Sequence, residues 1–234
     1  MNNTQSFNDQ EARFMHRILN TDIKKIPNSQ EDEIIFGCGC FWGAEKCFWK
    51  LPGVVTTSVG YAGGFKNNPS YYEVCSGLTG HSEVVRIVWN KDEIDISDLL
   101  KMFWECHNPT QKNRQGNDLG TQYRSAIYYT NNNNIDIINL SKEAYQKELY
   151  KKNFGLIETE IKKINAYYYA EQYHQQYLAS EGSRQYCSAA PTKVQLGSFN
   201  GSKYKLKSEI WDNFDWTIDK CVLRSDNKPI KLCN

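Results

Sequence analysis

The segment Gly39-Cys40-Phe41-Trp42-Gly43 constrains this chain more than any other. It places a thiol between two glycines and beside two aromatic rings. Residues 33–36 before it predict a strand, and residues 44–51 after it predict a short helix. A cysteine at such a turn lies at a helix N-terminus, where unpaired N–H groups and the helix dipole favour the thiolate. Packing alone does not require flanking glycines, so we predict that Cys40 is a nucleophile rather than a buried apolar residue.

Length and composition indicate one folded domain with extended ends. The chain has 234 residues, 40% of them hydrophobic, and no Pro/Gly/Ser linker divides it. We predict an N-terminal arm over 1–30, a catalytic domain over 31–190 and a C-terminal tail over 191–234 that packs on the domain. The net charge of +1 gives no electrostatic reason to expect nucleic acid as a partner. No apolar run approaches the roughly 20 residues of a membrane span.

The eight cysteines bear on compartment and chemistry. The polar start of the chain, residues 1–10, precedes nothing that resembles a signal peptide, which predicts a cytoplasmic protein in which structural disulfides are uncommon. The cysteines then serve packing, metal binding or redox chemistry. We expect no metal site, because Cys-x-x-Cys and His-x3–5-His spacings are absent. If Cys38 and Cys40 lie on one extended segment, their side chains point to opposite faces.

Interleaved strands and helices predict a mixed α/β layer structure. The predicted strands cover 33–38, 54–59, 83–89, 125–129 and 157–164, the last near a sheet edge because of its lysines. Ser97 is the expected N-cap of a helix over 98–106. Further helices are expected over 132–150 and 169–179. The polar segments 60–82 and 107–124 are expected loops, where functional sites commonly lie.

Several residues in or beside these loops have two interpretations. Glu83 is an exposed strand-end carboxylate from its spacing alone, or a general acid if an apolar pocket raises its pKa. Tyr71 and Tyr123 either pack with wet hydroxyls or, beside the Asp118 carboxyl, donate hydrogen bonds to a developing oxyanion. The rings that follow Cys40 are core aromatics or a hydrophobic floor for a methyl group.

Cys187 follows Tyr186 in a polar part of the tail. It is either a free thiol on a mobile surface segment or a second redox thiol that resolves an oxidised cysteine into a disulfide. Cys221 and Cys233 are further candidates in the tail. The remaining cysteines, apart from the unassigned Cys75, are expected to pack inside strands or helices: Cys38, Cys47 and Cys106.

The chain resembles the A-type peptide methionine sulfoxide reductases over roughly residues 33–187. The resemblance rests on blocks that occur in order: Gly39-Cys40-Phe41-Trp42-Gly43, Gly60-Tyr61-Ala62-Gly63-Gly64, Tyr71 with Glu73-Val74-Cys75, Gly77, Thr79-Gly80-His81-Ser82-Glu83-Val84-Val85, Phe103-Trp104 with His107, Asn113-Arg114-Gln115-Gly116-Asn117-Asp118 and Gly120-Thr121-Gln122-Tyr123-Arg124-Ser125. One five-residue match can arise by chance, but a whole set of matches in the same order does not readily arise in that way.

The resemblance implies reduction of the S epimer of methionine sulfoxide, free or in proteins, by attack of Cys40 on the sulfoxide sulfur. A protonated Glu83, helped by Tyr71 and Tyr123, would protonate the sulfoxide oxygen, which leaves poorly until it is neutralised. By the same resemblance, Phe41 and Trp42 would hold the S-methyl group and Asp118 would lie on the polar side of the pocket.

The resemblance also implies how the enzyme is recycled and how it folds. Cys40 becomes a sulfenic acid, Cys187 attacks it, and thioredoxin reduces the resulting disulfide, with no cofactor and no metal. The implied fold is α+β, with a central mixed sheet of ferredoxin-like type, flanking helices and long coil segments. We expect a monomer. The tail beyond Pro191 departs from the two-cysteine ending of some relatives, so a recycling role for Cys221 or Cys233 stays open, as does the role of Cys38.

Two other functions compete with the reductase. A thiol peroxidase would use Cys40 and Cys187 on hydroperoxides without needing the acid Glu83. A non-catalytic module would recognise oxidised or Met-rich surfaces through Phe41 and Trp42, and would keep its function after Cys40→Ser.

Overall fold

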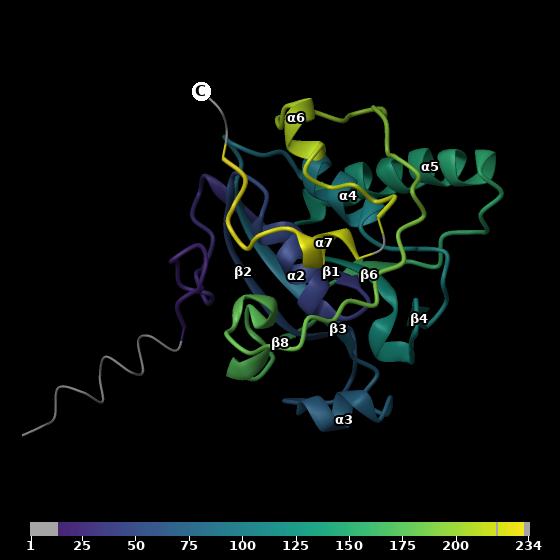
Figure 1. Cartoon of the computed structure of the whole chain (residues 1–234). Coiled ribbons are helices and arrows are strands. Elements are labelled where there is room, and N and C mark those ends of the chain that lie inside the picture. Colours follow the sequence, from purple (N-terminus) through teal and green to yellow (C-terminus); the bar gives the residue numbers. More distant parts are fainter. Residues whose placement is uncertain (1–13, 219, 232–234) are drawn as a thin grey trace, which may run out of the picture.

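A computed structural model describes residues 14–218 and 220–231 (Figure 1). Its centre is a sheet of six strands in the order β7-β6-β1-β3-β2-β8. The strands are β1 Glu31–Cys38, β2 Val54–Ala62, β3 Ser82–Asn90, β6 Ser125–Tyr129, β7 Glu160–Lys163 and β8 Tyr167–Tyr169. The β6–β7 pair is parallel and all others are antiparallel. The α+β class with a mixed sheet is therefore confirmed, as is the edge position of β7.

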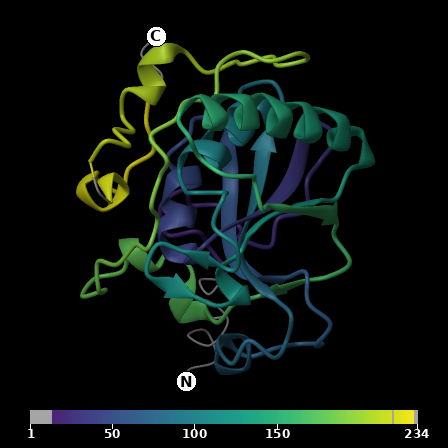
Figure 2. The same ribbon diagram turned by 90° about the vertical axis from the view of Figure 1, so that its right-hand side faces the viewer.

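Two helices pack on one face of this sheet. They are α2 Phe41–Trp49 and α4 Ile96–Glu105, and the longer α5 Ile135–Lys151 packs on α4. Phe36 of β1 joins them, because its ring lies 5.3 Å from that of Phe48 and 4.7 Å from that of Phe103. Burial of these large aromatic side chains stabilises the contact between the layers. Figure 2 shows α5 lying along the top of the strands.

The other described elements are short. Helix α3 Tyr71–Cys75 follows β2, and a hairpin of β4 Arg114–Gln115 and β5 Asp118–Leu119 precedes β6. The tail carries only α6 Ser208–Trp211 and α7 Cys221–Arg224. Figure 1 shows α3 at the lower end of the molecule, opposite α4 and α5, with β8 and β4 above it on either side. Within the described ranges, no helix combines the length and apolar character needed to cross a membrane.

Some sequence predictions about elements were wrong. The N-cap of α4 is Asp95, not Ser97, because the Asp95 carboxylate accepts the Ser97 N–H at 2.9 Å and Asp98 completes a capping box. The expected helix over 169–179 is instead the end of β8 followed by two 3-10 turns, with Gln176 at φ 47°. A left-handed residue interrupts an α-helix.

The described parts of the N-terminal arm and of the tail both pack against the domain. Residues 14–30 form no helix, although Met15 and Asp22 make a single β-bridge and His16 is buried; the remainder of the arm lies outside the described residues. Apolar tail side chains share one hydrophobic cluster with the sheet and its helices: Val194, Leu196, Leu206, Ile210, Phe214 and Val222. The tail therefore adds to the main core rather than lying loosely on it.

Candidate active site

A pocket of about 260 Å³ opens where α2 begins. Its lining residues come from five separated parts of the chain: Cys40, Phe41, Trp42, Tyr71, Glu83, Asp118, Tyr123, Arg184 and Tyr186. Seven of the eight site residues predicted from the sequence are in this set, and the eighth, Cys187, lies beside it. Sequence reasoning assigned no role to Arg184 or Tyr186.

Cys40 is the N-cap residue of α2 and is nearly enclosed. Burial raises its pKa well above the usual value, and the nearby Glu83 carboxylate raises it further, against a smaller lowering by the Trp42 N–H. The expectation that the helix N-terminus makes Cys40 a thiolate is therefore wrong. Desolvation of the sulfur outweighs one backbone hydrogen bond.

Glu83, the second residue of β3, is 2% exposed, so the exposed strand-end interpretation is wrong. The strand end lies beneath the turn into α2, and the Phe41 N–H donates to Glu83 Oε2 at 3.1 Å. Burial raises the pKa of this carboxyl to about 8, partly offset by that N–H and increased by the Asp118 charge. Glu83 therefore holds a proton at neutral pH, as a general acid must.

Two tyrosines face the same pocket from short helical turns. Tyr71 begins α3, and its N–H donates to Glu171 Oε1 at 2.9 Å, while Tyr123 ends a 3-10 turn over Thr121–Tyr123. Burial raises the pKa of both hydroxyls above the usual tyrosine value. Both hydroxyls are thus protonated at neutral pH and are able to donate hydrogen bonds.

The two rings after Cys40 are fixed by residues that sequence reasoning missed. The Trp42 indole stacks on Tyr177 with 3.8 Å between ring centroids, and its Nε1–H donates to His174 Nδ1 at 3.1 Å. The Phe41 ring lies 5.1 Å from the His174 ring. Together they form an aromatic wall. The concentration of aromatic residues over 167–177 is a sequence signal for this wall, whereas a helix was the prediction over 169–179.

Cys187 is 2% exposed, which contradicts the picture of a mobile surface thiol. A Cβ atom placed on Gly43 would lie 2.5 Å from Cys187 Sγ, so this sulfur packs directly on α2 three residues after Cys40. Burial raises the pKa of Cys187 to about 12. The seven cysteines in the described part of the chain are all free, and Cys233 lies outside it.

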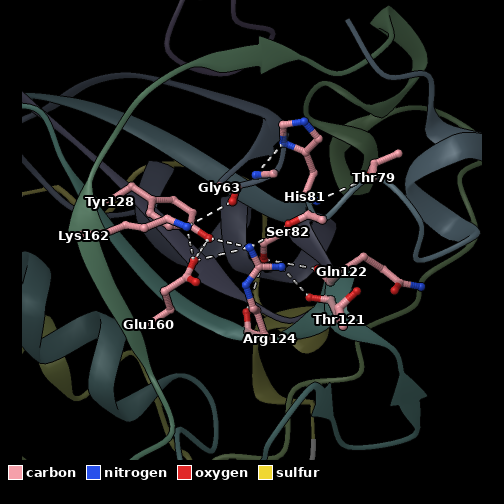
Figure 3. A network of polar contacts seen from close by, with 12 residues as sticks. Gly63, Thr79, His81, Ser82, Thr121, Gln122, Arg124, Tyr128, Glu160 and Lys162 are labelled. Atoms are coloured by element: carbon pink, nitrogen blue, oxygen red, sulfur yellow. Dashed lines mark hydrogen bonds and ion pairs between the residues drawn. The ribbon is translucent and has the colours of Figure 1, made fainter. Parts of the chain in front are cut away.

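A partly buried ion network centred on Arg124 adjoins the turn that carries Tyr123 (Figure 3). The Arg124 guanidinium donates to the carbonyl of Gly80 at 3.0 Å and to that of Thr121 at 2.8 Å. It also contacts Glu160 Oε1 at 3.3 Å. One side chain thus joins the segment before Glu83 to the turn that carries Tyr123.

Three potential metal ligands, Cys38, Cys106 and His107, have ligand atoms within 4.8 Å of one another in the core. The His107 ring already has a hydrogen-bond partner at each nitrogen. Its Nδ1 lies 2.7 Å from the Phe103 carbonyl and its Nε2 lies 2.8 Å from Ser125 Oγ. Both ring nitrogens are therefore engaged. The absence of a metal from the reaction stays a prediction.

Comparisons with known proteins agree on one family. The family model "Peptide methionine sulfoxide reductase" matches residues 32–205. The chain is 52% identical over 180 residues to peptide methionine sulfoxide reductase MsrA of Vibrio vulnificus, covering 77% of this chain and 86% of that protein. It is 57% identical over 165 residues to MsrA of Pseudomonas putida, covering 70% and 74%. Among solved structures, methionine sulfoxide reductase A of Corynebacterium diphtheriae matches with a TM-score of 0.67 and 41% identity, over 78% of this chain and 88% of that one.

Proposed function

The chain belongs to the A-type peptide methionine sulfoxide reductases, and we propose that its pocket performs this reduction with Cys40 as nucleophile and Glu83 as general acid. The protein is an oxidoreductase that reduces methionine sulfoxide to methionine. One observation carries the assignment of roles: a buried carboxyl with a pKa of about 8 shares the pocket with Cys40, the one thiol among the described residues that line it.

Substrate binding uses the aromatic wall and the hydroxyls. The S-methyl group of the sulfoxide packs between Phe41 and Trp42, and the sulfoxide oxygen points to Glu83 and to the two tyrosine hydroxyls. The two epimers exchange the positions of the S-methyl group and the rest of the substrate chain, so only one places its methyl group on the wall and its oxygen at Glu83 with the sulfur facing Cys40. The arrangement therefore supports selectivity for the S epimer, free or in proteins, with Asp118 on the polar side of the pocket.

Oxygen transfer begins with a proton. Glu83 protonates the sulfoxide oxygen, and the positive charge that develops on sulfur lowers the pKa of the neighbouring Cys40 thiol. The Cys40 thiol returns its proton to the Glu83 carboxylate as its Sγ bonds to the substrate sulfur. The substrate sulfur–oxygen bond then breaks as the hydroxyl passes to Cys40 Sγ, and the sulfur–sulfur bond breaks to release methionine and leave a Cys40 sulfenic acid. The tyrosine hydroxyls stabilise charge on the oxygen through hydrogen bonds. The oxygen atom ends on Cys40, and the substrate sulfur gains two electrons.

Recycling uses the second thiol. The Cys187 sulfur attacks the Cys40 sulfenic acid, which forms a disulfide and releases water. A dithiol reductant of the thioredoxin class then returns both cysteines to thiols by two exchange steps. Packing of Cys187 against Gly43, one helical turn from Cys40, supports this pairing.

The decisive experiment is a stereospecific assay. We expect the wild type with dithiothreitol to reduce only the S epimer, Cys40→Ser to be inactive, and Glu83→Gln to lose the first half-reaction. A Glu83→Gln variant that oxidises Cys40 as fast as the wild type would favour a thiol peroxidase. A Cys40→Ser variant that retains sulfoxide reduction would refute the nucleophile.

We also propose a finer description of the molecule. The order β6-β1-β3-β2, with α2 and α4 on one face, supports the ferredoxin-like assignment. Recycling by a thioredoxin-class reductant supports action in the cytoplasm. The monomeric state and the division at residues 30 and 190 stay predictions.

A further inference from the structure

Arg184 lines the active-site pocket, yet the proposed reaction does not use it. The residue is exposed, and among the described residues its guanidinium has no hydrogen-bond acceptor and no ion-pair partner. It lies three residues before Cys187, in the coil that follows Ser180. A charged guanidinium that faces a substrate pocket without a carboxylate partner is available to bind one from the substrate.

The position of this cation is held by the pocket itself. The Arg184 guanidinium lies 5.2 Å from the centre of the Tyr186 ring, within the range of a cation–π contact. The Tyr186 hydroxyl in turn donates to Asp118 Oδ1 at 2.5 Å, which fixes the ring against the β5 strand. These contacts from Arg184 through Tyr186 to Asp118 therefore place a positive charge at one side of the pocket.

The charges around the pocket make this cation distinct. Glu83 is neutral below a pH of about 8, so it adds no negative charge near neutrality. Asp118 is the other acidic residue that lines the pocket, and its carboxylate already accepts a hydrogen bond from the Tyr186 hydroxyl. The pocket thus offers one carboxylate and one cation, which suits the ammonium and carboxylate groups of a free amino acid.

We propose that Arg184 is a specificity-determining residue that binds a substrate carboxylate at the pocket mouth. The inference rests on the proposed function, because the sulfoxide side chain must enter the pocket and leave its backbone at the mouth. Two substrates supply this chemistry: the α-carboxylate of free methionine sulfoxide, and an acidic side chain next to methionine sulfoxide in a peptide.

The test compares Arg184→Gln and Arg184→Lys on four S-sulfoxide substrates with dithiothreitol as reductant. They are free methionine sulfoxide, its N-acetyl derivative, the neutral N-acetyl N-methylamide, and a capped peptide in which aspartate follows methionine sulfoxide. The matched control is Arg224→Gln, which removes an equal charge from an exposed position on α7, away from the residues that line the pocket.

We expect Arg184→Gln to raise KM about two- to fivefold for substrates that carry a carboxylate, the range for an exposed ion pair. The neutral amide should keep its KM, kcat should be unchanged, and Arg184→Lys should recover part of the loss. An effect on the free amino acid alone identifies the α-carboxylate as the ligand, and an effect on the acidic peptide alone identifies the side chain.

An equal loss on the neutral amide, or unchanged KM for every carboxylate substrate, would overturn the proposal. Failure of the proposed function has a different signature, since the wild type would then reduce none of the four substrates. The neutral amide thus separates the two.

Discussion

The carboxyl group of Glu83 is buried beneath the turn that carries Cys40, and its pKa is raised to about 8. A raised pKa means that the acid is protonated at neutral pH and loses its proton as the pH rises through about 8. The proposed reaction needs the protonated form. The rate of methionine formation should therefore be high near pH 6–7 and fall above pH 8.

The measurement is kcat/KM for the S sulfoxide across this range, for the wild type and Glu83→Gln. We expect the variant to lose about 100-fold or more in rate, as is usual for a removed general acid, and to lose the descending limb near pH 8. A Glu83→Gln variant with the wild-type limb would show that another group controls the reaction.

At the scale of elements, the site depends on a contact between α2 and the coil that carries Cys187. Cys187 is buried against Gly43, one helical turn from Cys40, and in the proposed recycling its sulfur attacks the Cys40 sulfenic acid. Replacing Cys187 by serine removes this step but leaves the pocket that performs oxygen transfer. We expect about one methionine per enzyme molecule and no sustained turnover with thioredoxin, measured by quenched-flow product analysis. Repeated thioredoxin-driven turnovers would assign resolution to another cysteine.

Gly43 gives a second way to test this contact. A Cβ atom there would lie 2.5 Å from Cys187 Sγ, so Gly43→Ala must displace the thiol or its segment. We expect the amount of methionine in the first turnover to be unchanged and the rate of disulfide formation to change, followed by mass analysis of trapped intermediates. Ala44→Gly, one residue further along α2, is a control for helix propensity. An unchanged rate of disulfide formation in Gly43→Ala would indicate that the packed position is not on the resolving path.

Sequence patterns correctly predicted strands and helices whose formation depends on residues close together in the sequence. The strand over 125–129 agrees with β6, since β-branched and aromatic residues run between clear boundaries. The predicted helix over 169–179 was wrong for two reasons. Its aromatic residues make tertiary contacts, such as that of Tyr177 with Trp42, and Gln176 has a left-handed backbone conformation that interrupts a helix. The burial of Glu83 and Cys187 depends on segments distant in sequence, so local spacing gave the wrong environment for both. The family resemblance, not the spacing, brought these residues into one site.

At the scale of the whole molecule, the tail beyond the matched family segment is anchored to the helix that carries Cys40. The matched segment ends at residue 205, and the following chain returns across the far end of α2. The Lys46 ammonium donates to the Ser225 carbonyl at 2.7 Å, and Trp49 Nε1–H donates to the Asn227 carbonyl at 3.1 Å. These contacts fix a segment that the family match does not include.

Lys50 is the most constrained of these anchors. Its side chain is 5% exposed and donates to the carbonyls of Asp226 and Lys228 at 3.0 and 3.1 Å, and to the Asp226 carboxylate at 3.0 Å. Asp226 is 68% exposed, so its carboxylate is screened by water and adds little. The hydrogen bonds to the two carbonyls therefore account for most of the stability that Lys50 contributes.

This asymmetry gives the prediction for the whole molecule. Lys50→Ala removes three donated hydrogen bonds and a buried aliphatic stem, and should lower the free energy of unfolding by about 2–3 kcal/mol. Asp226→Ala leaves both carbonyl contacts intact and should lower it far less. Urea denaturation followed by tryptophan fluorescence measures both, because Trp49 lies in the same contact. Equal losses in the two variants would mean that the ion pair, rather than the buried carbonyl contacts, holds the tail, and no loss in Lys50→Ala would mean that the tail is held by its apolar residues alone.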